Sequence, residues 1–558
     1  MGVTTETKTE SEVEEIKRAS NYLRGDLDND LSGAAANVSN ESEQLLKFHG
    51  IYAQDNRDVR RERALAKETL DYIFMIRVVI PGGRLSAEQW LGLDAIATSE
   101  ADGSLRLTTR QAVQFHGVLK GDLRELARSL DRQFLSSFGA CGDVVRNVVT
   151  CPNLHLENGH GHLEGIARQL RETFRSTSEA HWEIFVNGEK AASREEFEER
   201  PFYGETYLPR KFKIAVSHPH ENCVDVFAQD VGLIPSDDPE LGAGFTLLVG
   251  GGLGRSYANA DTFARLGEPL TFVTNDEVEE VIAAIIATYR DLGDRTDRKR
   301  ARMKYVVADL GLAAFRGEVE QRLGRALRLP RALPRTFDAD DHLGWRELPD
   351  GTYQLGVRVG AGRVRDLDGG ATLRSALRTI AETYPVTFFI TPQQDIIISG
   401  VREADRDPIE ALLRAHHVRL DGELGNVERR ALACPALPTC SQALAESERR
   451  LPELVSSIEG ALAARQLGRR PLQLRMTGCP NGCARPAVAE IGVVGRTKST
   501  YDVYVGGGVR GDRLATLFRE KVSLEDVPDV LGPLFDRWAE EAELDEPFGD
   551  FLARVGIT

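Results

Sequence analysis

From Tyr72 onward the apolar and polar positions follow the patterns of strands and helices, whereas the residues before it do not. The run Ile73–Ile80 is mostly apolar and β-branched and is closed by Pro81-Gly82-Gly83, which predicts a strand followed by a turn. Residues 1–70 are polar and charged with few apolar runs. We therefore expect an extended N-terminal arm that wraps a larger body and is not an independent domain.

Two different kinds of segment occur twice along the chain, in the same order. The matched pairs are 107–118 with 390–401, 80–85 with 359–364, and 247–253 with 503–509. Chance similarity of strand-turn segments is the alternative, but the repeated order favours duplication. The pattern predicts mixed α/β domains related by a pseudo-twofold axis, with a site between the halves.

Length and charge narrow the function classes. At ~150 residues per domain, 558 residues predict three to four domains. The formal net charge of -16 argues against a general nucleic-acid binder, because such proteins carry a basic surface. No apolar run approaches the ~20 residues of a membrane span, and residues 1–20 lack the layout of a secretion signal. We expect a cytoplasmic protein with no nucleic-acid or membrane partner.

Four of the seven cysteines lie in the last quarter of the chain as two close pairs. Cys434 and Cys440 form C-x5-C, and Cys479 and Cys483 form C-x3-C. Zinc sites prefer C-x2-4-C, whereas the prolines and glycines here suit the irregular backbone around an iron-sulfur cluster. Leucines at helical spacing after Cys440 predict a helix that begins at the cluster, its positive end toward the thiolates. A cluster is favoured; zinc and buried structural thiols are the alternatives.

The other three cysteines are Cys141, Cys151 and Cys223. An odd total argues against a disulfide framework, and these three have no partner spacing. We expect buried thiols at all three positions.

Further segments carry a family resemblance. They are Ser20–Gly25 (SNYLRG), Arg106–Thr108, Gln114–Gly117 (QFHG), Tyr207–Lys213 (YLPRKFK), Arg295–Lys299 (RTDRK), Thr477–Cys483 (TGCPNGC) and Phe548–Phe551 (FGDF). In this order and spacing the chain resembles the sirohaem-dependent sulfite and nitrite reductases from end to end. Within that family it is most similar to the haemoprotein subunits of the bacterial assimilatory sulfite-reducing members.

The resemblance implies the fold class and the domain organisation. The class is α/β with mixed sheets, in which duplicated sulfite/nitrite reductase modules with pseudo-twofold symmetry form three domains around a central cofactor. The implied segments are an arm at 1–70, a duplicated ferredoxin-like domain at 71–140 plus 345–420, a first sirohaem-binding domain at 141–344, and a second at 421–558 that carries the cluster.

The resemblance also implies the cofactors. A 4Fe-4S cluster is expected on Cys434, Cys440, Cys479 and Cys483, with the thiolate of Cys483 shared as the axial ligand of sirohaem. Asn481 and Arg485 flank this bridge and are expected to contact the macrocycle.

Sirohaem is a polycarboxylate and the implied substrate is an oxyanion, so this acidic chain needs a local set of cations. The resemblance assigns substrate binding and catalysis to Arg77, Arg146, Lys211 and Lys213. Cofactor contacts are expected from Arg106, Thr108, Arg110, Gln114, His116, Arg210, Arg302, Lys304, Gln394, Asn481 and Arg485. Ordinary surface charge is the alternative, but Arg77 interrupts an apolar run, and Lys211 and Lys213 point to one side of a strand. Either lysine is a candidate proton donor.

The implied reaction is the six-electron reduction of sulfite to sulfide in sulfate assimilation. Reduction of nitrite to ammonia is the nearest alternative, and the lysine at 213 favours sulfite. A noncatalytic protein with a structural zinc or cluster is the alternative from another class. The glycine runs at 250–252 and 506–508 do not fit a dinucleotide fingerprint, so electrons must come from a separate protein. An NADPH-dependent flavoprotein subunit or a ferredoxin is expected.

Overall fold

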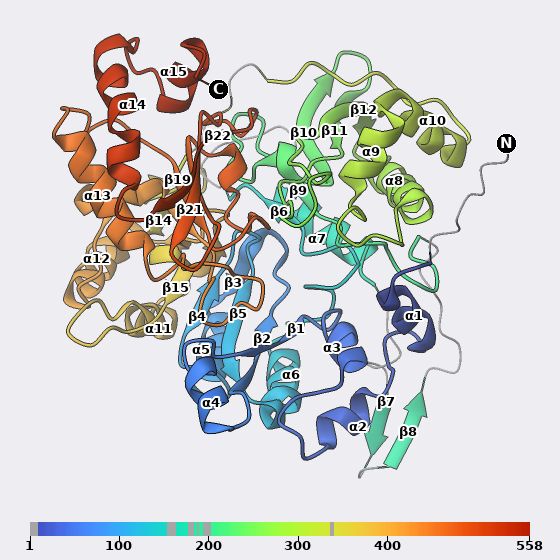
Figure 1. The fold of residues 1–558 in the computed structure, drawn as a ribbon. Coiled ribbons are helices and arrows are strands. Elements are labelled where there is room, and N and C mark those ends of the chain that lie inside the picture. Colours follow the sequence, from blue (N-terminus) through green and yellow to red (C-terminus); the bar gives the residue numbers. More distant parts are fainter. Residues whose placement is uncertain are drawn as a thin grey trace.

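The computed structural model describes residues 9–152, 163–176, 183–186, 189–193, 202–334, 337 and 340–557. Four five-stranded sheets dominate the fold, together with a small hairpin of β7 (Glu183–Val186) and β8 (Glu189–Ser193). Two sheets, at the top of Figure 1, come from the green and the orange-red parts of the chain. The other two contain the blue and the yellow strands.

The first two sheets are antiparallel, and each contains one strand from the other half of the chain. The first sheet has the order β1 (Ile51–Asp55), β2 (Tyr72–Arg77), β5 (Val113–Val118), β4 (Leu105–Leu107) and β15 (Arg363–Val364). The second has the order β13 (Gly344–Glu347), β14 (Tyr353–Val357), β17 (Ile396–Val401), β16 (Thr387–Ile390) and β3 (Arg84–Ser86). β3 thus completes the sheet of the second half, and β15 completes that of the first. Stacking of Trp90 on Phe388, with ring centroids 5.0 Å apart, adds an apolar contact across the exchange.

The second pair of sheets shares a mixed topology. One has the order β12 (Glu268–Thr274), β11 (Gly242–Val249), β10 (Val231–Asp238), β9 (Ile214–Val216) and β6 (Val149–Thr150). The other has the order β22 (Thr516–Ser523), β21 (Thr500–Val505), β20 (Ile491–Gly495), β19 (Leu474–Thr477) and β18 (Leu432–Ala433). In each sheet three parallel strands continue into an antiparallel hairpin. The duplication expected from the repeats is present in all four sheets.

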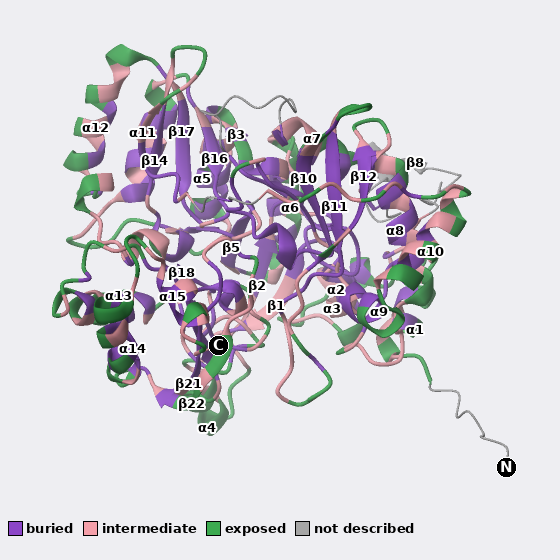
Figure 2. Ribbon diagram, turned by 90° about the horizontal axis from the view of Figure 1, so that it is seen from above, coloured by how far each residue is buried: buried purple, intermediate pink, exposed green. Residues whose placement is uncertain are grey.

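Helices cover these sheets because each has an apolar stripe at helical spacing. In the first half they are α5 (Ala87–Ser99), α6 (Leu123–Arg132), α7 (Leu163–Thr173), α8 (Val278–Leu292), α9 (Met303–Leu310) and α10 (Leu312–Leu323). In the second half they are α11 (Leu373–Thr383), α12 (Arg406–Ala415), α13 (Leu451–Ala463), α14 (Val527–Glu541) and α15 (Phe548–Arg554). Ser86 and Gln89 form a capping box that fixes the start of α5. Figure 2 shows buried strands at the centre and exposed helix faces outside.

The N-terminal segment is not extended. It forms α1 (Glu12–Ala19), α2 (Leu27–Ser32), α3 (Asn40–Leu46), β1 and α4 (Arg60–Ala66). Lys17 is buried and its Nζ donates to Glu14 Oε1 at 2.5 Å and to the Leu208 carbonyl at 3.0 Å. Short helices arise here because a few apolar residues, such as Leu45 and Leu46, find a surface to pack on.

We propose domain limits that follow the sheets: 71–140 with 345–420, 141–344, and 421–558. Residues 1–70 act as an arm, whose strand β1 belongs to the first sheet. The first eight residues of this arm lie outside the described part of the chain.

Candidate active site

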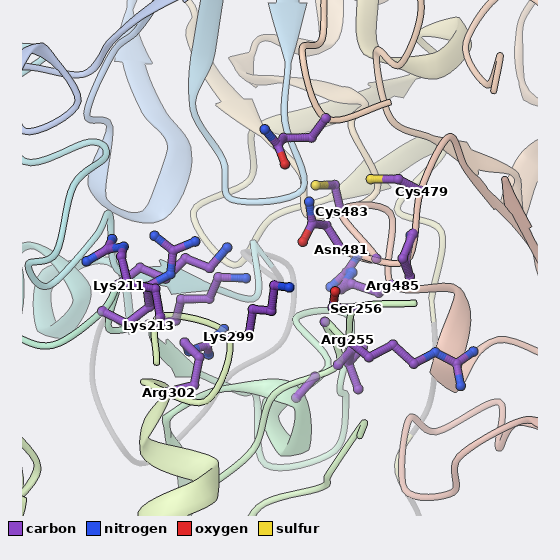
Figure 3. Close-up of a pocket in the computed structure, with 18 of the residues that line it drawn as sticks. Lys211, Lys213, Arg255, Ser256, Lys299, Arg302, Cys479, Asn481, Cys483 and Arg485 are labelled. Atoms are coloured by element: carbon purple, nitrogen blue, oxygen red, sulfur yellow. The ribbon is translucent and has the colours of Figure 1, made fainter. Parts of the chain in front are cut away.

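A cavity of about 450 Å³ lies between the two mixed sheets (Figure 3). On one side it is lined by cations, and on the other by the turn that carries Cys479 and Cys483. The expected site residues that line it are Arg110, Arg210, Lys211, Lys213, Arg302, Cys479, Asn481, Cys483 and Arg485. The site expected between the halves is therefore formed by residues from both of them.

The loops after β18 and β19 carry the four clustered cysteines. Cys434 and Cys479 are buried, Cys440 is half-buried, and Cys483 is exposed. The amide of Gly478 donates to Cys434 Sγ at 3.3 Å. Burial raises the pKa of Cys479 to about 12, while the amide of Asn481 opposes that shift. Amides directed at sulfur are the contacts that stabilise thiolates bound to iron, so the loops fit such a group.

The same loops do not have the spacing of a zinc site. Zinc holds four sulfurs at ~2.3 Å, which brings the sulfurs within ~4 Å of one another. Among the described residues, the one group of three or more such ligands whose atoms all lie within 4.8 Å of each other is found elsewhere in the fold. The sulfurs of Cys434, Cys440, Cys479 and Cys483 are therefore not all within 4.8 Å of one another, as ligands of a single zinc ion would be.

The helix expected to begin at Cys440 begins later. α13 starts at Leu451, and the residues in between form turns. The amides of Gln442 and Ala443 hydrogen-bond to the Cys440 sulfur and oppose the rise in its pKa that burial causes. Individual amides thus replace the helix end that the leucine pattern predicted.

Two lysines face the cysteine turn across the cavity (Figure 3). Burial, with Arg210 and Arg302 nearby, lowers the pKa of Lys211 to about 7. Burial and the neighbouring Lys211 lower the pKa of Lys213 well below its usual value. Both amines therefore lose their protons at a lower pH than a lysine in water does.

We call the cations on this side of the cavity, Arg110, Arg210, Lys211, Lys213 and Arg302, the cationic wall. Asp230 links two of its segments. Its Oδ2 accepts from Arg302 Nη2 at 2.7 Å and from the backbone amide of Lys213 at 2.9 Å. Arg110 donates to Gln229 Oε1 at 3.0 Å, and burial followed by the charge of Arg146 lowers its pKa to about 9. Asp230, and Asp143 beside Arg210, are outnumbered by the surrounding cations, which leaves the wall with a net positive charge.

Arg77 and Arg146 lie beside this wall rather than on the lining of the cavity. Arg77 Nη1 donates to Cys141 Sγ at 3.1 Å. With the amide of Gln114 oriented to satisfy its neighbours, its oxygen accepts from Arg77 Nη2 at 2.6 Å. Arg146 donates to the carbonyls of Gly142 and Ala140 at 2.9 and 3.3 Å. Burial lowers the pKa of Arg77, but Cys141, Tyr52 and Cys483 outweigh it and raise that pKa overall.

Comparison with known proteins agrees with this geometry. The nitrite and sulphite reductase 4Fe-4S domain matches residues 167–327 and 425–558, and the nitrite/sulfite reductase ferredoxin-like half domain matches 66–133 and 346–416. The chain belongs to the nitrite and sulphite reductase family. This is a family of oxidoreductases that bind sirohaem and a 4Fe-4S cluster.

Individual relatives are similar over nearly their whole length. The sulfite reductase [NADPH] hemoprotein beta-component of Chromohalobacter salexigens is 44% identical over 548 residues, which cover 98% of this chain and 95% of the relative. That of Methylobacterium sp. (strain 4-46) is 43% identical over 545 residues, covering 97% and 90%. The solved structure of the Mycobacterium tuberculosis NirA protein has a TM-score of 0.78 at 27% identity, covering 97% of this chain and 95% of that one. None of the helices described here is long and apolar enough to cross a membrane.

Several residues expected to hold the cofactor of this family contact protein groups instead of lining the cavity. Arg106 donates to Glu448 Oε2 at 3.0 Å and to the Ala433 carbonyl at 2.8 Å, beside Cys434. Lys304 donates to the carbonyls of Gly254 and Gly252 at 2.6 and 3.2 Å. These contacts support the loops that form the cavity.

The remaining expected residues are buried near the same loops. The Thr108 hydroxyl accepts from the amides of Ala112 and Arg110 at 3.2 and 3.3 Å and so shapes the turn that carries Arg110. His116 is buried, and burial lowers its pKa far below the usual value. Gln394 has a positive φ of 70° and is the counterpart of Gln111, whose φ is 49°.

Sequence reasoning missed part of the cavity lining. Arg255, Ser256, Tyr257, Arg298 and Lys299 also line it. Arg255 and its neighbours follow the first glycine run, and Arg298 and Lys299 end a segment that carries the family resemblance. Both signals were present in the sequence. Nothing local to either segment predicts which side chains turn inward.

Proposed function

We propose that this protein reduces sulfite to sulfide by the reaction SO3²⁻ + 6 e⁻ + 7 H⁺ → HS⁻ + 3 H2O. The observation that carries the proposal is one cavity in which Lys211, Lys213 and Arg302 face the Cys479–Cys483 turn. A small anion held there has cations on one side and the cysteine turn on the other.

When bound, sirohaem and the 4Fe-4S cluster would pass electrons from the donor protein to the substrate and would supply an iron that binds it. Cys434, Cys440, Cys479 and Cys483 would hold the cluster, and Cys483 would also bind the sirohaem iron. Arg110, Arg210, Arg302, Asn481 and Arg485 would hold the macrocycle and its carboxylates. Arg106, Thr108, Gln114, His116, Lys304 and Gln394 would position the surrounding loops.

The chain itself binds the substrate through charge. A unit-charge pair at 4 Å is worth about 1 kcal/mol in water and about 4 kcal/mol at an effective dielectric constant near 20. Lys211 and Lys213, backed by Arg77 and Arg146, would favour a dianion such as sulfite over a monoanion. Their confinement in a partly buried wall retains partly reduced anions between electron transfers.

The chain also delivers protons. With a pKa of about 7, Lys211 is protonated on the acid side of neutrality and can give its proton to a departing oxygen, then regain one from water. Lys213 takes up a proton when a dianion arrives, because the added negative charge offsets its cationic neighbours.

The electron donor is proposed from the relatives. Those similar over most of their length are named as NADPH sulfite reductase components, so we infer an NADPH-dependent flavoprotein as partner and a role in cytoplasmic sulfate assimilation. An acidic exterior suits a donor with a basic docking face. If a ferredoxin supports faster turnover than the flavoprotein, the partner assignment is wrong.

The test is a spectrum followed by turnover. Purified protein should show sirohaem absorption and about five iron atoms per chain, the sum of the two groups. With reduced methyl viologen as donor, it should form sulfide from sulfite with a higher kcat/KM than it forms ammonia from nitrite. A colourless protein would refute the enzyme assignment. A clear preference for nitrite would refute the substrate.

A further inference from the structure

Four buried side chains meet at a second place in the fold, outside the cavity lining. Cys151 Sγ lies 2.8 Å from Glu221 Oε2, and His342 Nε2 lies 2.9 Å from Glu221 Oε1. Cys223 completes the group, and one ligand atom from each of the four lies within 4.8 Å of every other. Relative exposures of 4%, 1%, 3% and 1% for Cys151, Glu221, Cys223 and His342 place the group away from solvent.

The position of this group in the fold repeats that of the cluster cysteines. Thr150 and Ala433, the last residues of β6 and β18, pair with Val216 and Met476, respectively. The next residues are Cys151 and Cys434. The two cysteines therefore occupy equivalent positions in the duplicated sheets.

Cys223 and Cys483 also occupy equivalent positions in the two halves. Val231 pairs with Ile214 as Ile491 pairs with Leu474, which fixes the register of the two sheets. Cys223 then corresponds to Cys483: each lies two residues before a left-handed residue, Asp225 (φ 48°) or Arg485 (φ 60°). The pseudo-twofold axis thus relates two cluster ligands to two members of the buried group.

With its remaining two members, the group has the ligands to bind a single metal ion. Glu221 and His342 add a carboxylate and an imidazole to two thiols, and zinc binds all three ligand types at ~2.0–2.3 Å in a tetrahedron. Four ligands of one chain with little solvent access leave no open position, as in structural zinc sites.

We propose that Cys151, Glu221, Cys223 and His342 bind one structural zinc ion, at the position in the first half that corresponds to the cluster in the second. The ion joins three separate segments: the end of β6, the loop before the 3-10 turn Val226–Ala228, and the residues just before β13. This site does not depend on the proposed reaction.

The site has a structural consequence for the main cavity. The carbonyl of Cys223 accepts from Arg485 Nη1 at 3.3 Å, and Asp225, two residues on, contacts the same arginine. His342 has a left-handed φ of 61°, a conformation that residues other than glycine rarely adopt. A metal bond to its ring would hold that backbone in place. Zinc bound here fixes the loop that positions Arg485 at the cofactor.

Metal analysis of the purified holoenzyme tests the site without reference to activity. About one zinc per chain is expected besides the iron. Cys223→Ser and His342→Asn should each lower bound zinc at least about tenfold after dialysis, since even outer-shell changes cost 10–100-fold in affinity. Cys141→Ser, at a buried cysteine outside the group, should keep its zinc.

X-ray absorption at the zinc edge of the unmodified protein gives a second readout that needs no variant to fold. Two sulfur neighbours at ~2.3 Å and two nitrogen or oxygen neighbours at ~2.0–2.2 Å are expected. Four sulfur neighbours would mean that zinc has replaced iron at the cluster cysteines, which would overturn the proposal. It would equally be overturned by zinc-free holoenzyme, or by a Cys151–Cys223 disulfide in the native protein.

Discussion

Arg485 and Asp225 occupy equivalent positions in the two halves of the chain and contact each other, with Arg485 Nε 3.1 Å from Asp225 Oδ2. Arg475 Nη1 also reaches Asp225 Oδ2, at 2.6 Å. All three side chains are buried. The pseudo-twofold axis therefore brings a carboxylate from one half against two guanidinium groups from the other, at the edge of the cofactor cavity.

Asp225→Asn should lower both the stability of the fold and the amount of sirohaem that the protein binds. Removing one partner of a buried ion pair costs about 3–5 kcal/mol, because the other charge is left uncompensated. We expect a lower unfolding temperature and a lower sirohaem content per chain, measured by thermal denaturation and absorbance. Asp368→Asn, at an exposed position, should change neither. Full sirohaem content and unchanged stability in Asp225→Asn would contradict this role.

Turnover should fall as the pH rises through and above about 7. The pKa of Lys211 is lowered to about 7, so the side chain loses its proton above that pH and can neither donate it nor attract the anion. A bound anion raises the pKa of Lys211, so this decline in turnover (the basic limb of the pH profile) begins at a higher pH when substrate is bound. In Lys211→Arg, kcat should be lower at every pH and should lose this decline, because arginine keeps its charge but does not give up its proton.

The measurement is kcat against pH with saturating sulfite and with saturating nitrite. Sulfite itself ionises near neutrality and nitrite does not, so a limb that appears with both substrates belongs to the protein. An identical limb in the wild type and in Lys211→Arg would assign the proton to another group.

Lys213→Asn should lower kcat/KM for sulfite more than for nitrite. A dianion loses about twice the Coulomb energy of a monoanion when one cation is removed, and ~1.4 kcal/mol of difference is a factor of ten. We expect the sulfite-to-nitrite ratio to fall about tenfold or more, measured by steady-state kinetics. Lys498→Asn, at an exposed lysine, is the control. Equal losses for both substrates would show that Lys213 does not discriminate.

Asp143 should make the attachment of the N-terminal arm sensitive to acid. Burial alone would raise the pKa of Asp143, but Arg298, Lys17 and Arg210 hold it at about 2. Because this pKa lies below the unfolded value of ~3.9, the carboxylate stabilises the fold above pH ~4, and that contribution is lost as the pH falls toward 2. Its size is of order 2–3 kcal/mol.

Asp143→Asn should therefore unfold at a lower temperature than the wild type at pH 6, and the gap should narrow below pH 4. Thermal denaturation at several pH values measures both effects, with Asp131→Asn at an exposed position as control. A gap that stays constant down to pH 3 would mean that packing, not charge, causes the loss.

Local pattern was sufficient for the duplicated parts of the fold. Residues 107–118 and 390–401 form equivalent strands, and Gln111 and Gln394 within them share a left-handed turn, because the same turn chemistry was retained in both copies. The cysteine spacing likewise indicated the cluster loops. The leucine pattern misplaced the helix start, because amide-to-sulfur contacts stabilise the turns after Cys440 without a helix.

Contacts between segments far apart along the chain could not be predicted from the sequence. The exchanged strands are short, and nothing in Arg84–Ser86 or Arg363–Val364 marks a pairing across the halves. Cys151 and Glu221 are 70 positions apart, and His342 lies farther still along the chain, so no spacing rule joins them. All three remaining cysteines are buried, as expected, but Cys151 and Cys223 have partners that only the fold provides.

The exchange of β3 and β15 restricts how such a chain could have arisen. A single copy of the repeated unit would leave the edge of its own sheet open and would offer a strand with no sheet to join, a state prone to pair with other chains. Two copies placed together satisfy both needs at once. One polypeptide thus has the arrangement of a strand-swapped homodimer with both subunits in a single chain.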